Sequence, residues 1–175
     1  MWSDPDDIET WIDTVEKIYF AGGEPLVEER NYKILQAMID QGRTDIQIDI
    51  STNASTMKFK KYDLQEMLSK FDEVSFNVSI DHYGDKAEYM RNGMDFEVLK
   101  KNVLRVLRET DNTTITFINT FNALSLTSFR EWLQFILELR EEFAKDRQGI
   151  KYIPVPDNGG HKHPDYEIRP KQRIW

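Results

Sequence analysis

The segment KIYFAGGEPL, residues 17–26, decides how the rest of the chain is interpreted. Its first half is apolar and rich in β-forming residues, which predicts a strand over residues 17–21. Two glycines, a carboxylate and a proline follow, and glycine lets the backbone turn sharply and leaves main-chain groups open to a ligand. Glu24 adds an anion that suits an ammonium group. Taken alone, the pair of glycines fits an ordinary turn better than a ligand site.

Composition limits the classes of protein to consider. The chain has 175 residues, which is typical of one domain, and it contains no cysteine. Disulfides, cysteine nucleophiles and thiolate-bound clusters formed by this chain alone are therefore excluded. The net charge of −8 argues against a general binder of nucleic acid or of anionic membranes. The sequence has neither an apolar run of about 20 residues nor a secretory signal, so we expect a cytoplasmic protein.

Helical and strand patterns alternate along the chain. Amphipathic spacing predicts helices over residues 4–15, 31–41, 63–71, 86–90, 96–107 and 127–143. Strands are predicted over residues 17–21, 45–52, 74–80, 114–121 and 150–155. Such alternation predicts an α/β fold with parallel strands and right-handed crossovers. From Asp157 onward the sequence is polar and irregular, and no element is predicted there.

Each of the first four strands is followed or ended by small polar residues. They are Gly22, Gly23 and Glu24; Ser51, Thr52 and Asn53; Ser79 and Asp81; and Asn119, Thr120 and Asn122. A parallel barrel or part-barrel brings these residues to one rim, which is where α/β proteins bind ligands. Each residue alone is most simply a turn or a helix cap. Together they suit a small ligand with an amine, a carboxylate and a ribose, where Asp81 could bind hydroxyl groups and Arg91 a carboxylate.

Four motifs in this order resemble those of radical S-adenosylmethionine (SAM) enzymes. They are YFAGGEPL at residues 19–26, STN at 51–53, SID at 79–81 followed by EYMRNG at 88–93, and NTFN at 119–122. The resemblance covers residues 4–156, and it is strongest to members that carry a shortened SPASM, or twitch, auxiliary domain. It implies a partial (β/α)6 TIM-like barrel with outer helices, of which the first strand is missing here.

The resemblance also implies roles for individual residues. The segment Gly22, Gly23, Glu24 and Pro25 would hold the amino group of SAM, and Ser79 and Arg91 would meet its carboxylate. Ser51, Asn53, Asp81 and Asn119 become candidates for ribose or adenine contacts. No catalytic residue and no metal ligand is assigned, because His161 and His163 are more simply part of a polar loop.

The chain departs from that family in one essential respect. Radical SAM enzymes hold a [4Fe–4S] cluster through a CxxxCxxC loop, and this chain has no cysteine. We therefore expect a fragment, with residues 1–156 forming a partial core and residues 157–175 a polar tail or the start of an extension. The intact protein would cleave SAM to a 5′-deoxyadenosyl radical that abstracts hydrogen from an unknown small-molecule or peptide substrate, whereas this chain alone would be inactive. Two alternatives stay open: a cluster-less module that binds SAM or a nucleotide, and an unrelated α/β interaction domain.

Overall fold

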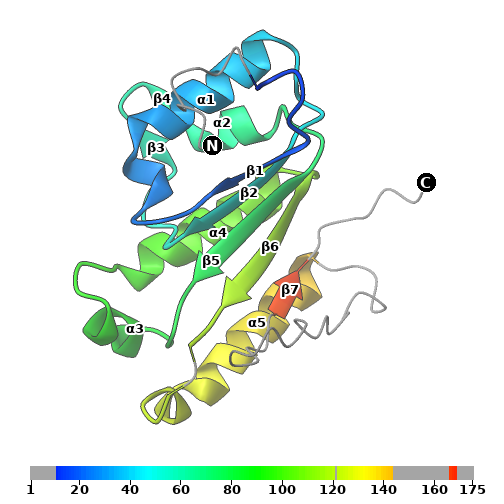
Figure 1. Ribbon diagram of the computed structural model, residues 1–175. Coiled ribbons are helices and arrows are strands. Elements are labelled where there is room, and N and C mark those ends of the chain that lie inside the picture. Colours follow the sequence, from blue (N-terminus) through cyan, green and yellow to red (C-terminus); the bar gives the residue numbers. More distant parts are fainter. Residues whose placement is uncertain (1–10, 121, 144–165, 169–175) are drawn as a thin grey trace, which may run out of the picture.

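A five-stranded sheet forms the centre of the protein (Figure 1). The computed structural model describes residues 11–120 and 122–143, together with the backbone of residues 166–168. The strand order is β1-β2-β5-β6-β7. Four strands pair in parallel, namely β1 (Lys17–Phe20), β2 (Gln47–Thr52), β5 (Val74–Ser79) and β6 (Thr113–Ile118). The short β7 (Tyr166–Ile168) is antiparallel to β6.

Helices connect the parallel strands. The 3₁₀ turn η2 (Pro25–Val27) and α1 (Glu29–Asp40) lead from β1 to β2. A hairpin of β3 (Lys58–Phe59) and β4 (Tyr62–Asp63) and the helix α2 (Leu64–Leu68) lead from β2 to β5. The helices α3 (Asp85–Met90) and α4 (Phe96–Glu109) precede β6, and the turn η3 (Ser125–Thr127) and α5 (Phe129–Phe143) follow it.

The sheet has one apolar face and one polar face. On β2, β5 and β6, buried and half-buried positions alternate without a break. The buried positions belong to the hydrophobic core, where Phe76 and Phe117 are fully enclosed. Aromatic rings from α5 pack on Phe117, with Trp132 at 5.2 Å and Phe135 at 6.2 Å between ring centroids. The helices therefore cover the apolar face, as their spacing of apolar residues requires.

The structure confirms the predicted alternation of helices and parallel strands and contains further elements that were not predicted. The hairpin β3–β4 and the antiparallel β7 were not predicted, because strands of two or three residues carry no readable alternation. The apolar spacing of α5 predicts one buried face made of Phe129, Trp132, Leu133, Ile136 and Leu137, and this prediction is partly wrong. Leu137 is 52% exposed, whereas Phe135 and Leu139 are buried.

Three predicted elements lie wholly or partly outside the described residues. These are the strand at 150–155, the first part of the helix at 4–15 and the last residue of the strand at 114–121. Residues 11–14 form a hydrogen-bonded turn in which Thr14 and Val15 donate to the Trp11 carbonyl. The four parallel strands agree with the expected partial barrel.

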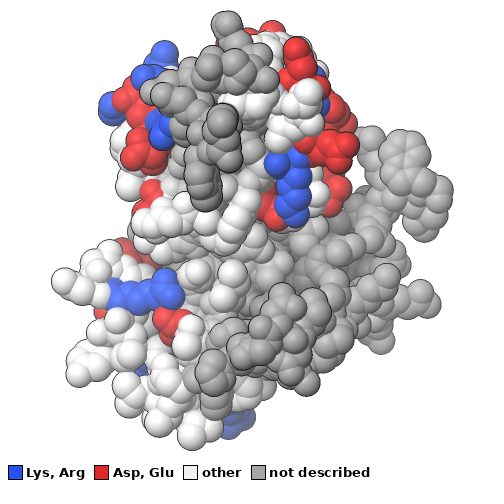
Figure 2. All heavy atoms as spheres, in the orientation of Figure 1, with Lys and Arg blue, Asp and Glu red and all other residues white. Residues whose placement is uncertain are grey.

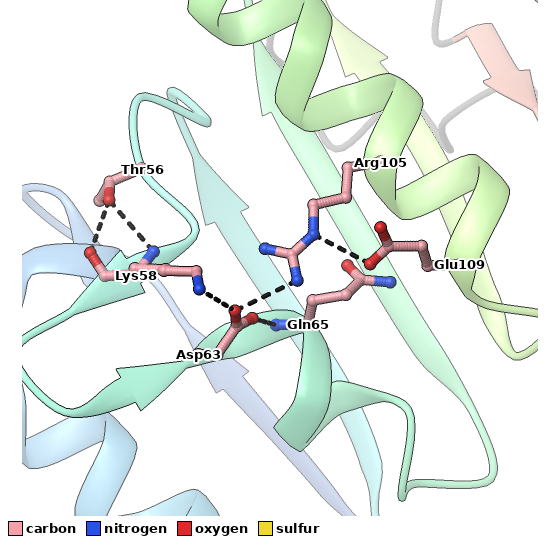
Figure 3. A network of polar contacts seen from close by, with 6 residues as sticks. All are labelled: Thr56, Lys58, Asp63, Gln65, Arg105 and Glu109. Carbon is pink, nitrogen blue, oxygen red and sulfur yellow. Dashed lines mark hydrogen bonds and ion pairs between the residues drawn. The ribbon is translucent and has the colours of Figure 1, made fainter.

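A network of charged side chains joins the β3–β4 hairpin to α4 (Figure 3). The Asp63 carboxylate, which is 8% exposed, receives Lys58 Nζ at 3.0 Å and Arg105 Nη2 at 3.1 Å. Its other oxygen accepts from the Gln65 amide and caps α2. Burial alone would raise the pKa of Asp63, but the bonds from Lys58 and Arg105 outweigh that effect and lower the pKa.

This network predicts an acid-dependent loss of stability. A carboxyl whose pKa is lowered on folding stabilises the protein above its unfolded pKa of about 4, and this contribution is lost as the pH falls through the folded value. We expect Asp63→Asn to lower the free energy of unfolding by about 1.5 kcal/mol at pH 7, because Lys58 and Arg105 lose a charged acceptor while Arg105 keeps Glu109. In urea unfolding, the difference between wild type and variant should shrink below pH 4.

The matched control is Asp95→Asn. Asp95 caps α4 by accepting from the Val98 amide, and asparagine caps equally well. This control should change stability by a few tenths of a kcal/mol at pH 7. A difference between wild type and Asp63→Asn that stays constant from pH 7 to pH 3 would contradict the role given to the network.

Candidate functional site

The chain turns sharply after β1 through Gly22 and Gly23. Their φ angles are +89° and +56°, a backbone conformation that side chains with a Cβ rarely adopt. A Cβ built on either residue would meet no atom within 4 Å. The glycines are therefore required by the turn itself, and the space beside them is open to a ligand.

The Glu24 carboxylate joins the carboxyl ends of β1 and β2. One oxygen accepts from Thr52 Oγ1 at 2.5 Å and from the Leu26 amide at 3.1 Å, and the other accepts from the Asn53 amide at 2.8 Å. Thr52 Oγ1 in turn accepts from the Ala54 amide at 2.9 Å. Because a carboxylate offers about four acceptor positions, Glu24 keeps room for one further donor.

Tyr32 on α1 fixes the η2 turn through a hydrogen bond. Its buried hydroxyl donates to the Leu26 carbonyl at 2.9 Å, and the Asn31 side chain donates to the Pro25 carbonyl at 3.0 Å. Burial, with smaller effects from the Glu24 and Asp63 carboxylates, raises the pKa of Tyr32 to about 12. The turn that carries Glu24 is thus fixed on one side by β2 and on the other by α1.

A second group of polar residues lies after β5 and β6. The Asp81 carboxylate accepts from the Thr120 amide at 3.0 Å through Oδ1, and from Arg91 Nε and Nη2 at 2.9 Å through Oδ2. Arg91, which was predicted to bind a ligand carboxylate, is thus already paired with Asp81, which was predicted to bind ligand hydroxyls. The side chain of Arg91 remains 33% exposed, and a guanidinium has five N–H donors, of which the contacts with Asp81 use two.

The parallel pairing brings all the predicted residues to the carboxyl edge of the sheet. Ser51 on β2 is hydrogen-bonded to the Tyr19 hydroxyl at 2.8 Å, and Ser79 ends β5 beside Ile118 on β6. Asn119 follows β6 and is 6% exposed. The contacts divide the edge into two groups, one around Glu24 and one around Asp81.

Sequence reasoning missed two features of this edge. It named Thr52 among the polar residues of the rim but did not predict that its hydroxyl binds Glu24. It also did not predict that His82, in the turn after β5, is buried: the residue is 1% exposed and its Nε2 lies 3.5 Å from Asn122 Nδ2. The inward position of Thr52 could have been found from the alternation of β2, since every second residue before it is apolar.

No group of three potential metal ligands occurs in the described residues, and His161 and His163 lie outside them. None of the helices in this part of the chain is long and apolar enough to cross a lipid bilayer.

Comparison with known proteins supports the resemblance drawn from the motifs. The chain is 33% identical over 147 residues to a GTP 3',8-cyclase of Campylobacter lari, a match that covers 82% of this chain and 41% of the relative. The chain therefore spans less than half the length of that relative. No protein-family model matches the chain, and no solved structure matches it. The similarity supports the radical SAM superfamily and agrees with an α/β part-barrel, while a SPASM or twitch extension stays a prediction.

The position of Tyr32 predicts an alkaline loss of stability. Folding raises its pKa from the usual 10 to about 12, so its contribution is present below pH 10 and is lost as the pH rises toward 12. We expect this loss to reach about 2 kcal/mol in urea unfolding. Tyr32→Phe should remove the pH dependence and cost about 1 kcal/mol at pH 8 through the lost hydrogen bond to Leu26.

Tyr89→Phe serves as the control, because Tyr89 is 85% exposed. The account of Tyr32 would be wrong if Tyr32→Phe lost as much stability between pH 10 and pH 12 as the wild type.

Proposed function

We propose that this chain is part of a radical SAM enzyme and that the carboxyl edge of its sheet binds SAM. The observation that carries the proposal is the Glu24 carboxylate, which is fixed by Thr52 and Asn53 beside an open glycine turn. The order of the four motifs and the similarity to the GTP 3',8-cyclase support the same family.

The residues of the edge suit the amino-acid end of SAM. Glu24 has an acceptor position left for the ammonium group, and Gly22 and Gly23 leave the approach to it free of side chains. Arg91 would bind the carboxylate with the guanidinium N–H groups that are not bonded to Asp81, while Nε and Nη2 remain bonded to Asp81. Ser79 would add a hydroxyl to that carboxylate, and Ser51, Asn53, Asp81 and Asn119 are the candidates for ribose and adenine contacts.

The residues of this chain do not fit the [4Fe–4S] cluster of the family. Such clusters are bound by cysteine thiolates, and the 175 residues include no cysteine. We therefore assign the chain SAM binding and positioning and no electron-transfer step. Hydrogen abstraction from a substrate belongs to the intact enzyme, and GTP is a candidate substrate because the relative is named for it.

A cluster-less module that binds SAM or a nucleotide is the second candidate. The observation that favours it is the same lack of cysteine, together with a site that is formed by this chain alone. Anaerobic reconstitution of the 175-residue chain with iron and sulfide, followed by a 5′-deoxyadenosine assay, should give no product.

Titration of the chain with SAM tests the site directly. We expect Glu24→Gln and Arg91→Gln each to weaken SAM binding about tenfold, because each removes a charge-assisted hydrogen bond. Isothermal titration calorimetry or ligand-observed NMR measures the change.

The controls are Glu66→Gln on α2 and Arg108→Gln on α4, two exposed residues on helices that precede β5 and β6 and lead to the amino edge of the sheet. They should bind SAM as the wild type does. The SAM site would be refuted if the wild type failed to bind SAM, or if the controls lost as much affinity as the site variants.

A further inference from the structure

A β-turn formed by residues 91–94 connects α3 to α4. The Arg91 carbonyl accepts from the Met94 amide at 3.0 Å, which closes the turn. Gly93 has a φ of +83°, as expected at the third position of a type II turn, where glycine is preferred. Asn92 and Gly93 are both exposed, so the tip of the turn faces solvent.

The side chain of Asn92 and the amide of Gly93 are both free of hydrogen bonds. Neither group has a partner among the described residues, and the hydrogen bond of the turn uses the Met94 amide instead. A Cβ built on Gly93 would meet no atom within 4 Å, so the space beside this glycine is open. The Asn92 side chain can therefore rotate until its amide carbon lies against the Gly93 nitrogen.

The other asparagines in the described part of the chain are fixed or shielded. Most have side chains that are hydrogen-bonded to the backbone: Asn31 to the Pro25 carbonyl, Asn53 to the Ser55 amide, Asn102 to the Ala54 carbonyl, Asn112 to the Leu68 and Phe71 carbonyls, and Asn122 to the Leu124 amide. Asn77 lies within β5, and Asn119 is 6% exposed. Each of these asparagines is followed by a residue with a Cβ, which hinders the approach of a side chain to the next nitrogen. Asn92 therefore combines exposure, a free side chain and a following glycine.

An asparagine in this arrangement can lose its amide group without an enzyme. The Gly93 nitrogen gives up its proton to a base in the solvent and attacks Cγ of Asn92. The bond between Cγ and Nδ2 then breaks, and the amide leaves as ammonia after taking up a proton from solvent. Water opens the resulting succinimide ring at either carbonyl, so that the step consumes water and needs no oxidant or reductant. One opening gives an aspartate, and the other gives an isoaspartate, in which the main chain passes through Cγ and is longer by one carbon.

Either product places a new carboxylate next to Arg91. The Arg91 guanidinium already shares its charge with Asp81 through Nε and Nη2 at 2.9 Å. Figure 2 shows that charged side chains gather toward the top of the view, whereas the described surface around α3, at the lower left, is mostly uncharged. An added negative charge would therefore weaken the attraction of Arg91 for a ligand carboxylate.

We propose that Asn92 is a site of spontaneous deamidation and that the modified chain binds SAM more weakly than the unmodified chain. The modification follows from the turn itself and does not depend on the identity of the ligand. The loss of affinity rests on the proposed function, because it acts through Arg91 at the carboxyl edge of the sheet. The affinity of the site would thus fall as the protein ages.

Ageing of the 175-residue chain at 37 °C and pH 8 tests the modification. Samples taken over several days are cut after glutamate, which yields the peptide of residues 89–97 and separates it from a second Asn-Gly pair at residues 158–159. Mass spectrometry should show that Asn92 is converted about tenfold faster than Asn122, because glycine leaves the attacking nitrogen unhindered. Isoaspartate methyltransferase should label the same peptide, and the rate should rise between pH 6 and pH 8 because the attacking nitrogen must lose its proton. A sample taken at time zero corrects for conversion during digestion.

A synthetic peptide of residues 89–97 shows whether the fold protects the site. The folded chain should react on the same timescale as the peptide, because the fold holds neither the Asn92 side chain nor the Gly93 amide. Asn92→Gln should show almost no conversion in this segment, since glutamine would have to form a larger ring. The modification is refuted if Asn92 stays intact in the folded chain under conditions in which the peptide reacts.

Asn92→Asp reproduces the added charge without ageing. We expect this variant to bind SAM about fivefold more weakly, as expected for a unit charge close to Arg91 in solvated surroundings. Lys70→Gln is the matched control, because it makes the same change in net charge at an exposed residue shortly before β5, and it should bind SAM as the wild type does. Aged wild type should lose affinity in proportion to the converted fraction, whereas aged Asn92→Gln should not.

These titrations separate the inference from the proposed function. If fresh wild type does not bind SAM, the proposed function fails, while the mass measurement still decides whether Asn92 is modified. If SAM binds with its dependence on Glu24 and Asn92→Asp binds it as tightly as the wild type, the proposed effect of the modification is wrong.

Discussion

The Glu24 carboxylate is the contact on which the candidate site depends. It follows β1 and accepts hydrogen bonds from Thr52 and Asn53 at the end of β2. These bonds fix the position of the glycine turn relative to β2. On its other side, the turn is held by hydrogen bonds from Tyr32 and Asn31 on α1. The group that we propose to bind the ammonium of SAM is therefore also the group that positions its own surroundings.

At the other end of the carboxyl edge, the ion pair of Asp81 and Arg91 likewise both stabilises the fold and forms part of the proposed ligand site. It joins the segments that follow β5, α3 and β6, because Asp81 also accepts from the Thr120 amide. A ligand carboxylate would find an arginine that is already oriented, at the cost of sharing its charge with Asp81. The two groups are linked by the parallel strands, which keep both at one edge of the sheet.

The sequence predicted the parts of this structure that follow from local pattern. The alternation of Ile46, Ile48 and Ile50 with polar residues identified β2, and the glycines after β1 identified the turn. It could not predict that Arg91 pairs with Asp81, because that contact depends on where α3 places Arg91 relative to the segment that follows β5. The hairpin β3–β4 and β7 were missed because their pairing depends on distant or very short segments.

The most direct measurement of the central claim is a map of backbone amide shifts when SAM is added to the isotopically labelled chain. The account predicts shifts at Gly22, Gly23, Ser79 and Thr120, which mark the carboxyl edge of the sheet. Amides at the opposite edge, such as those of Thr44, Asp72 and Asn112, should remain unchanged. Shifts concentrated at that opposite edge, or none at the glycine turn, would contradict the account.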